Sequence, residues 1–411
     1  LPFVVLCGII VLAQRKEDRE VTMTVVKVRL YPNKNQEEQI WINFNHTRSL
    51  WNKLLGLQME RYENSKDNES AKRSAYLGGY DMAILLPLIK QENPWMNEAD
   101  SRAMQEVTTN LDLAFKRFFK KTSGYPRFKS WKRSKQAYTT KQRLQLVGEN
   151  HLKLPKLGPV KFKQKFIPEG RLKRATVSIS ATGNYYASVV IEREIEPLPK
   201  TGKSVGIDLG LASLSTQSDG TKIPLPRFDK SLAKKKRYWE RKLDRRRIRA
   251  LSVIHEQKKL GHTLELEDFA NYTRAKYMVA KYSEKERNQR NDYHQKYTTK
   301  LVKEFDTIVI EDLKPSNLVK NHKLARAVAN AGWRSLRTML EYKTSWYGKE
   351  LIVINPAYTS QVDFETGEIQ KKGLKIREYV NSNGTLVDRD INAAKNILKW
   401  GLYPETRVTK A

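Results

Sequence analysis

The sequence predicts a multidomain α/β protein. A small antiparallel β-barrel carries an inserted helical domain, and a domain of buried strands and helices follows it. Three observations predict this fold. The chain has 411 residues, enough for two or three domains that each have a core. Residues 141–200 hold short alternating runs separated by turn signals. From residue 203 onward, apolar runs of strand length are separated by helical stretches.

The chain opens with an apolar run that is too short to cross a bilayer as a helix, and no basic segment precedes it. We interpret residues 1–22 as an extension outside the fold, and we expect a cytoplasmic protein without a membrane partner. "TVVKVRLYP" (24–32) alternates apolar and basic residues, as a half-buried strand does. We expect residues 23–32 to complete the barrel that residues 136–200 form, in which a Thr-Gly-Asn turn marks a hairpin.

Residues 33–135 are expected to form the inserted helical domain. Asn33 and Gln36 have the spacing of a capping box, and apolar residues follow at helical intervals. A second helix is expected over about 101–121. The segment after it, "GYPRFKSWKRSKQAYTT" (124–140), interleaves basic and aromatic residues, which suits backbone contacts and base stacking in nucleic acid. The alternative for this segment is a solvated loop with a few packed rings.

Residues 203–411 are expected to form the last domain. The stretches "SVGID", "FDTIVIEDL" (305–313) and "LIVINPAY" (351–358) are typical of buried strands. Residues 325–347 are expected to form one aromatic-rich helix. A basic helical insertion, 230–303, separates the first two strands.

The charge of the chain indicates a polyanionic partner. It carries 77 basic and 45 acidic residues, a net charge of +32, which destabilises a compact protein unless a partner supplies countercharge. Nucleic acid is favoured over a membrane surface, because no helix is basic and apolar enough for a membrane. Positions 234–249 hold ten Lys or Arg and two acids. This helix is either a solvated surface or a nucleic-acid rail, which here means a basic surface that contacts the nucleic-acid backbone along its length. We favour the rail, with Lys235, Arg241, Arg245 and Arg246 as candidate contacts.

Cysteine and histidine usage excludes two kinds of site. Cys7 is the single cysteine, so no disulfide within the chain and no cysteine-based zinc site can form. The six histidines are scattered without metal-ligand spacing.

Three acids stand at the edges of apolar elements. Asp208 ends "SVGID", Glu311 ends "TIVIE", and Asp390 heads "INAAKNILKW". A sheet can bring these distant residues together, and three converging carboxylates repel one another unless divalent cations neutralise them. Oxygen ligands suit Mg²⁺ or Mn²⁺. Two such ions about 4 Å apart can support phosphodiester hydrolysis.

Taken singly, each acid has a structural alternative as a turn former or a helix cap. The residues Asp388 and Asp390 are two apart, so on a helix their side chains diverge. We assign Asp390 to the metal and Asp388 to capping. The small residues Ala393 and Ala394 are expected to let this helix lie close against the sheet.

The motifs "VGIDLG", "IVIEDL" and "DRDINAAKNI" resemble the three acidic motifs of a RuvC-like nuclease of the RNase H fold. In addition, "KVRLYPNKNQ", the "PRF" segment, the "GW" of "ANAGWRSLRTMLEYKTSWYG" and "NPAYTSQ" are similar to TnpB proteins. Insertion sequences encode these proteins, which are related to the compact type V CRISPR effectors. The similarity covers about residues 24 to 400.

The resemblance implies an RNA-guided endonuclease that hydrolyses both strands of DNA by a two-metal mechanism with Mg²⁺ (or Mn²⁺). Its implied partners are a transposon-derived guide RNA and double-stranded target DNA, in the nucleoid of a bacterial or phage context. Base pairing would read the sequence, while the protein would hold the backbone and the heteroduplex.

The resemblance also implies roles for parts of this chain. It assigns catalysis and Mg²⁺ binding to Asp208, Glu311 and Asp390. It makes residues 33–135 the recognition domain, the barrel the wedge domain, and residues 203–411 the RuvC-like domain. Candidate nucleic-acid contacts are Gln105, for a DNA motif beside the target, together with Arg127 and Lys129.

In one place the sequence departs from the family. After "TSQ", these proteins usually carry two CxxC pairs that bind zinc, whereas residues 360–386 contain no cysteine. Thr366-Gly367 and Asn383-Gly384 indicate turns there instead. We therefore expect a metal-free hairpin and no zinc.

Two other functions remain open. One is a guided DNA-binding repressor on the same scaffold that does not cut; retention of all three acids argues against it. The other is a DNA-strand transposase, for which no Tyr or Ser nucleophile stands in a recombinase-like setting. An acidic triad could also serve strand transfer.

Overall fold

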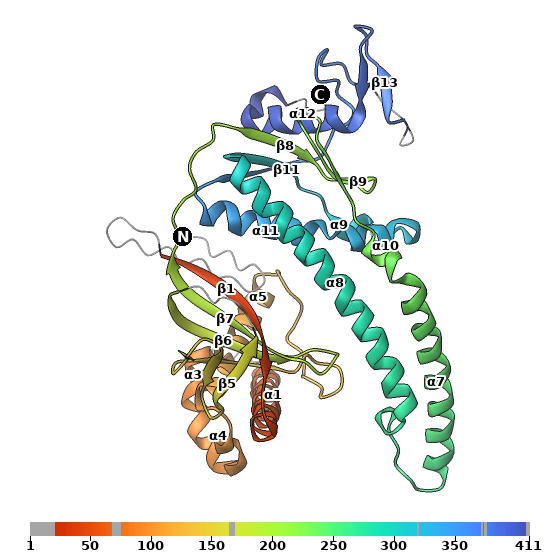
Figure 1. Ribbon diagram of the computed structural model, residues 1–411. Coiled ribbons are helices and arrows are strands. Elements are labelled where there is room, and N and C mark those ends of the chain that lie inside the picture. The colour runs from red at the N-terminus through yellow and green to blue at the C-terminus, as the bar shows by residue number, and fades with distance from the viewer. Residues whose placement is uncertain are drawn as a thin grey trace. The chain divides into compact units, whose positions relative to one another are not determined.

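The computed structural model divides into two compact units, one up to Glu194 and one from Ile195 (Figure 1). Residues 1–20 of the predicted N-terminal extension lie outside the described part of the chain, whereas Val21 and Thr22 belong to the first strand. Within the described part, no helix is both long and apolar enough to cross a membrane. The described residues are 21–67, 75–163, 169–318, 320–370, 373 and 376–407.

A seven-stranded antiparallel sheet forms the centre of the N-terminal unit. Its strand order is β2-β6-β7-β1-β5-β4-β3, with β1 paired to β7 and β5. The order ends at β2 and β3, and no pairing between described residues joins these two strands. The predicted barrel is therefore a curled sheet, because alternation fixes which side chains face inward but not whether the edges meet. The strands are β1 (Val21–Tyr31), β2 (Ala137–Lys141), β3 (Gln145–Val147), β4 (His151–Leu154), β5 (Gly158–Lys163), β6 (Arg171–Ile179) and β7 (Tyr185–Glu194).

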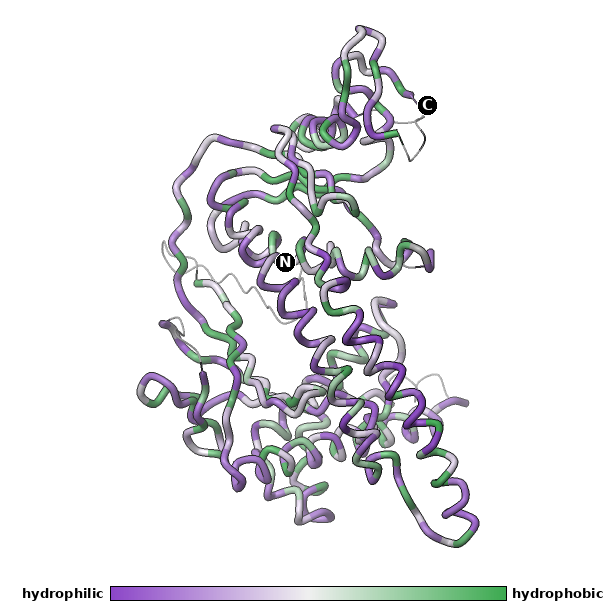
Figure 2. The backbone as a smooth tube through the Cα atoms, turned by 45° about the vertical axis from the view of Figure 1, so that its right-hand side comes forward, coloured by the Kyte–Doolittle hydropathy of each residue, from purple (hydrophilic) through white to green (hydrophobic). Residues whose placement is uncertain are grey.

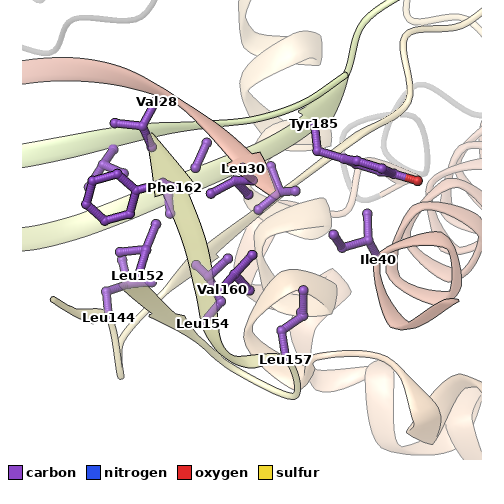
Figure 3. Close-up of a cluster of buried hydrophobic side chains, with 14 of the residues drawn as sticks. Val28, Leu30, Ile40, Leu144, Leu152, Leu154, Leu157, Val160, Phe162 and Tyr185 are labelled. Atoms are coloured by element: carbon purple, nitrogen blue, oxygen red, sulfur yellow. The ribbon is translucent and has the colours of Figure 1, made fainter. Parts of the chain in front are cut away.

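One face of this sheet is covered by apolar side chains. Val28 and Leu30 of β1 and Val160 and Phe162 of β5 are all buried, as their alternation predicts (Figure 3). Ile40, from the first helix, packs into the same cluster. The hydrophobic effect therefore fixes the register of the central strands.

Helices lie between β1 and β2 in the sequence, as expected of an insertion. The first begins at a capping box in which Asn33 accepts from the Gln36 backbone at 2.9 Å and Gln36 accepts in return. Leu50, Leu54 and Leu111 are fully buried in a second core among these helices. The elements are α1 (Lys34–Asn64), α3 (Gly79–Ile84), α4 (Leu86–Glu92), η1 (Pro94–Glu98) and α5 (Ser101–Phe119).

The C-terminal unit is built on a five-stranded sheet of order β10-β9-β8-β11-β12. Strands β8, β11 and β12 run parallel, and β9 and β10 are antiparallel to their neighbours. The carboxyl ends of the three parallel strands therefore meet at one edge of the sheet. The strands are β8 (Ser204–Asp208), β9 (Ser213–Gln217), β10 (Lys222–Pro224), β11 (Thr307–Glu311) and β12 (Glu350–Ile354).

Helix α12 (Arg389–Leu402) packs directly on β8 and β11. Ala393 and Ala394 are buried in this contact, as predicted. The backbone of Ala394 lies so close to Gly206 of β8 that a Cβ at Gly206 would overlap its carbonyl oxygen. Small residues on both elements thus allow the close approach.

The basic insertion consists of two long helices, α7 (Ala233–Lys259) and α8 (Ala270–Glu304), which pack together as a hairpin. Most of the hairpin is hydrophilic (Figure 2). The short helix α6 (Phe228–Ser231) precedes it, and η2 (Leu266–Asp268) lies in its turn.

The single helix predicted over 325–347 is two helices, α10 (His322–Ala331) and α11 (Trp333–Trp346). They meet at Gly332, whose φ of +61° is left-handed and ends the first helix. The prediction was wrong because the apolar spacing continues across the break. Helix α9 (Pro315–Leu318) precedes them.

The segment 360–386 forms the predicted hairpin in part: β13 (Glu378–Val380) pairs with β14 (Leu386–Asp388). Gly384 has a left-handed φ of +80° in the turn between them. After α12, the short helix η3 (Pro404–Thr406) is the last helix of the described residues.

Candidate active site at the carboxyl edge of the parallel sheet

Two of the three acids stand at the ends of adjacent parallel strands. The pairing between β8 and β11 ends at Ile207 and Ile310, and Asp208 and Glu311 follow as the last residues of their strands. Both acids therefore leave the sheet at its carboxyl edge, the usual position of ligand sites in such sheets. Because the strands are buried apolar runs, both backbones are held in place.

The third acid belongs to the first turn of α12. Asp388 is the N-cap of this helix and accepts from the backbone of Asp390 at 2.9 Å and of Ile391 at 3.1 Å. The capping assignment of Asp388 is therefore confirmed. Since Asp388 satisfies the helix end, the carboxylate of Asp390 is not used for capping.

The electrostatics of Asp208 show that the three carboxylates lie near one another. Burial, together with the charges of Glu311 and Asp390, raises the pKa of Asp208 to about 8. Arg389 and Arg377 oppose this shift without cancelling it. Asp208 thus feels the charges of both other acids and of two arginines, and a shared cation site for the three acids stays a prediction.

Glu311 is buried, and burial raises its pKa to about 7. The hydroxyl of Thr359 donates to its Oε1 at 2.6 Å, and this bond favours the charged form. Thr359 lies in the loop that follows β12. The sequence analysis did not identify it, although it lies in the quoted "NPAYTSQ" motif.

Arg377 supplies positive charge beside the third acid. Its Nη1 donates to Oδ1 of Asp390 at 3.0 Å and to Oδ2 at 3.2 Å. Sequence reasoning missed Arg377, because a single arginine in a polar segment has no periodicity or motif that separates it from other surface arginines. Arg389, directly before Asp390 in the sequence, donates to the carbonyl of Gly373 at 3.0 Å.

The chemistry of the donors suits a hard divalent cation. All three acids offer carboxylate oxygens, and two of them have raised pKa values that a bound cation would reverse. In the part of the chain that the structure describes, no three His, Cys, Asp or Glu side chains are yet arranged to hold a metal ion. At Asp390, the guanidinium of Arg377 contacts the oxygens that such an ion would need.

A hollow of about 640 Å³ lies at the carboxyl ends of β11 and β12, and none of the three acids lines it. Apolar side chains from β12 and α9 form part of its wall, and polar groups complete it. The volume lies in the range of small-molecule and nucleotide sites. Its polar and charged lining residues are Asp312, Lys314, Asn317, Arg337 and Asn355.

The candidate rail residues all lie on α7. Lys235, Arg241 and Arg245 are exposed, whereas Arg246 is half-buried and donates to the carbonyl of Asn271 at 2.7 Å. On the same helix, the ammonium of Lys242 lies 4.5 Å from the ring centroid of the exposed Tyr238. Basic and aromatic groups are therefore available together on this helix.

The other candidate contacts lie in the N-terminal unit. Gln105 is exposed on α5, where its Oε1 accepts from Arg102 at 2.8 Å. Arg127 has an exposed side chain, and its carbonyl accepts from Trp51 at 3.0 Å.

Lys129 points inward. Its ammonium lies 3.6 Å from the ring centroid of Trp51, and burial lowers its pKa to about 8. Its backbone is held by both amide atoms of Asn52. Of these candidates, Lys129 is therefore placed to fix the segment 124–131 against α1.

Three family comparisons match separate parts of this chain. Residues 187–322 match a family described as "Probable transposase". Residues 333–397 match "Cas12f1-like, TNB domain", and residues 23–67 match "Helix-turn-helix domain".

Two relatives are similar over nearly their whole length. A protein of Streptomyces pristinaespiralis, named "Putative RNA-guided DNA endonuclease", is 34% identical over 382 residues, which is 92% of this chain and 89% of that protein. "Putative RNA-guided DNA endonuclease InsQ" of Escherichia coli (strain K12) is 29% identical over 398 residues, 91% of each chain. A solved structure, "Cryo-EM structure of the Cas12f1-sgRNA-target DNA complex", covers 92% of this chain and 98% of its own at 13% identity. Its TM-score of 0.44 is too low to define the fold.

Proposed function

Because the chain belongs to the TnpB family, we propose that it is an RNA-guided, Mg²⁺-dependent DNA endonuclease. The observation that supports this proposal is the position of Asp208 and Glu311 at the carboxyl ends of adjacent parallel strands, with the charge of Asp390 acting on Asp208. Nearly all of the chain aligns with relatives that are named as endonucleases of this kind. The fold proposed for the C-terminal unit is the RuvC-like form of the RNase H fold.

We assign metal binding to the three acids. Bound there, Mg²⁺ or Mn²⁺ would activate a water molecule and stabilise the departing oxygen, with two ions sharing the work. The chain itself contributes a rigid frame, since β8 and β11 fix two of the acids and the capped start of α12 fixes the third. Asp390 would exchange its contact with Arg377 for the cation.

The hollow at the ends of β11 and β12 gives the substrate room. Lys314 supplies positive charge there, Arg337 is paired with Asp312 and Glu341, and Asn317 and Asn355 supply amides. Apolar walls with a few polar groups suit a nucleotide next to the bond that is cut. The DNA strand would pass over the carboxyl edge from the acids into this hollow.

The nucleic-acid partners are a guide RNA and double-stranded target DNA. A net charge of +32 supports them, because three strands of phosphate must be held together. On α7, Lys235, Arg241 and Arg245 are exposed candidates for backbone contacts. Gln105 and Arg127 are candidates in the N-terminal unit.

We further propose that segment 360–386 needs no zinc. In place of a metal, the buried carboxylate of Asp363 accepts from Tyr379 at 2.7 Å and from the backbones of Glu365 and Thr366. The side chain of Asn381 donates to Glu365 at 3.1 Å and accepts from the backbones of Asn383 and Thr385 in the turn that follows it. This network joins the loop to the β13–β14 hairpin, which is the task that zinc performs in zinc-binding knuckles.

The test is guided cleavage. The protein is purified with its RNA, the RNA is sequenced, and the complex is reprogrammed with a guide that matches a plasmid. With Mg²⁺ the parent should cut the plasmid, and the Asp208→Ala complex should bind it without cutting. If the parent bound the plasmid but never cut it under any guide, the repressor alternative would replace the endonuclease. If Asp208→Ala cut like the parent, the assignment of Asp208 would be wrong.

A further inference from the structure

We propose that Thr359, Asn392 and Asn396 are positioning residues that fix Glu311 relative to the helix that carries Asp390. They do so through a hydrogen-bonded bridge that runs across the loop segment 359–364. The proposal rests on the proposed nuclease function and adds residues to its site that contact neither substrate nor cation.

One end of the bridge lies on Glu311. The hydroxyl of Thr359 is 2.6 Å from Oε1 of Glu311, and both residues are buried, at 4% and 7% exposure. The same hydroxyl is 3.1 Å from the carbonyl of Pro356. A hydroxyl has one proton to donate, so the shorter contact to the carboxylate takes it.

The other end lies on α12. Asn392 and Asn396 are four residues apart on one face of this helix, and their exposures are 2% and 1%. The amide of Asn396 donates to the carbonyls of Thr359 at 3.0 Å and Val362 at 2.7 Å. Asn392 donates to Val362 at 2.7 Å, and it accepts from the backbone of Phe364 at 2.8 Å.

These bonds have a structural explanation that must be separated from the proposed one. Backbone groups of a buried loop need partners, and two asparagines supply them. That explanation accounts for the contacts of Asn392 and Asn396 with Val362 and Phe364. It does not explain why the hydroxyl of Thr359 donates to the carboxylate of Glu311, which belongs to the candidate cation site.

The consequence is a defined position for the Glu311 carboxylate. Glu311 has rotatable side-chain bonds, and without a partner its two oxygens could adopt several orientations. With Thr359 held by Asn396, one oxygen is fixed to a loop that is itself fixed to α12. Partners of this kind, behind a metal ligand, typically change metal affinity or activity about 10–100-fold when they are removed.

Two substitutions at Thr359 separate the hydroxyl from the shape. In the guide-RNA complex, Thr359→Val removes the hydroxyl at nearly constant volume, and Thr359→Ser keeps it. We expect T359V to need roughly tenfold or more Mg²⁺ for half-maximal cleavage, or to cut about 10–100-fold more slowly. T359S should stay within about threefold of the parent, and both variants should bind guide and target as the parent does.

The matched control is Thr344→Val. Thr344 is also buried, and its hydroxyl donates to the carbonyl of Leu340 within α11, away from the acids. Its removal should leave the Mg²⁺ dependence of cleavage unchanged. In a double-mutant cycle, Asn396→Leu should add little to T359V, since both break the same bridge.

The proposal would be overturned if T359V kept the Mg²⁺ dependence and the cleavage rate of the parent. It would also be overturned if T359S and T359V lost cleavage to the same extent. Binding of Mn²⁺ to the purified complex, followed by electron paramagnetic resonance, distinguishes this failure from a failure of the nuclease assignment. If the parent bound Mn²⁺ but did not cut, weaker binding by T359V would still support the bridge, and equal binding would overturn it.

Discussion

Asp208 is half-buried near two other carboxylates, and this arrangement has a cost for the cation-free protein. Its pKa in the folded chain, about 8, lies above the ordinary value of 3.8. Between these two pH values the folded protein holds a proton that the unfolded chain has released. The stability that this group contributes is complete below about pH 4, and it is lost as the pH rises to 8.

The first prediction follows from this loss of stability with rising pH. Asp208→Asn, which cannot ionise, should be more stable than the parent at pH 8 in EDTA, by on the order of 1 kcal/mol or more. The difference should shrink as the pH falls towards 4. Chemical denaturation at several pH values measures both quantities.

The exposed Asp292, on α8, provides the control. Asp292→Asn should change stability by less than about 0.5 kcal/mol at either pH. An Asp208→Asn protein that is no more stable than the parent at pH 8 would contradict the proposed crowding of negative charge.

At the scale of the element, the contact between α12 and β8 decides where Asp390 lies. Gly206 allows the two backbones to approach, since a Cβ there would meet the backbone of Ala394 and the side chain of Leu398. No side chain can move aside to relieve an overlap with a carbonyl oxygen. The spacing of the helix from β8 thus depends on Gly206.

The second prediction concerns this spacing. Gly206→Ala should push α12 outward, destabilise the protein by about 1–3 kcal/mol and reduce guided cleavage more than target binding. Thermal unfolding and a cleavage assay on the same preparation provide both measurements. Gly56→Ala is the control: nothing lies within 4 Å of a Cβ there, and α1 continues through it. That variant should be as stable as the parent or slightly more stable.

The third prediction concerns the hairpin at segment 360–386. Tyr379→Phe removes the hydrogen bond to Asp363 and should cost about 1.5–3 kcal/mol, the usual range for a bond to a charged group. Tyr403→Phe, at an exposed position, should cost almost nothing. A zinc chelator should leave the unfolding of the parent unchanged. Loss of stability on chelation would show that this segment holds a metal after all.

At the scale of the whole molecule, charge is the dominant feature. Basic residues outnumber acidic ones by 32, and α7 carries a dense group of them. Exposed lysines and arginines contribute little to folding, so their concentration is explained by a polyanion. Affinity for nucleic acid should therefore fall steeply with salt.

The fourth prediction locates part of that affinity on α7. Arg241→Glu with Arg245→Glu should weaken binding of the guide–target duplex and reduce the slope of log K against log salt by roughly 1.5–2. Lys281→Glu with Lys300→Glu changes the same charge at exposed positions of α8 and is the control. Equal losses in the two double variants would mean that the effect is general and that α7 is no rail.

How much of the site could be read from the sequence depended on the range of the interactions. Asp208 and Glu311 were identifiable because a strand end is a local pattern, and Asp388 because a cap is local too. Arg377 and Thr359 were not, since their partners lie 13 and 48 residues away and no local pattern links them. The same limit explains the broken helix at Gly332 and the barrel that is a curled sheet.

The central claim is that Asp208, Glu311 and Asp390 together bind the divalent cation that cleaves DNA. The most direct measurement is anomalous scattering from Mn²⁺ in crystals of the complex with guide and target. The account predicts one or two Mn²⁺ peaks that all three carboxylates contact at about 2.0–2.2 Å, the distance typical of small divalent ions. A cleavage-competent complex whose Mn²⁺ lies elsewhere, or in which one of the three carboxylates faces away from it, would contradict the account.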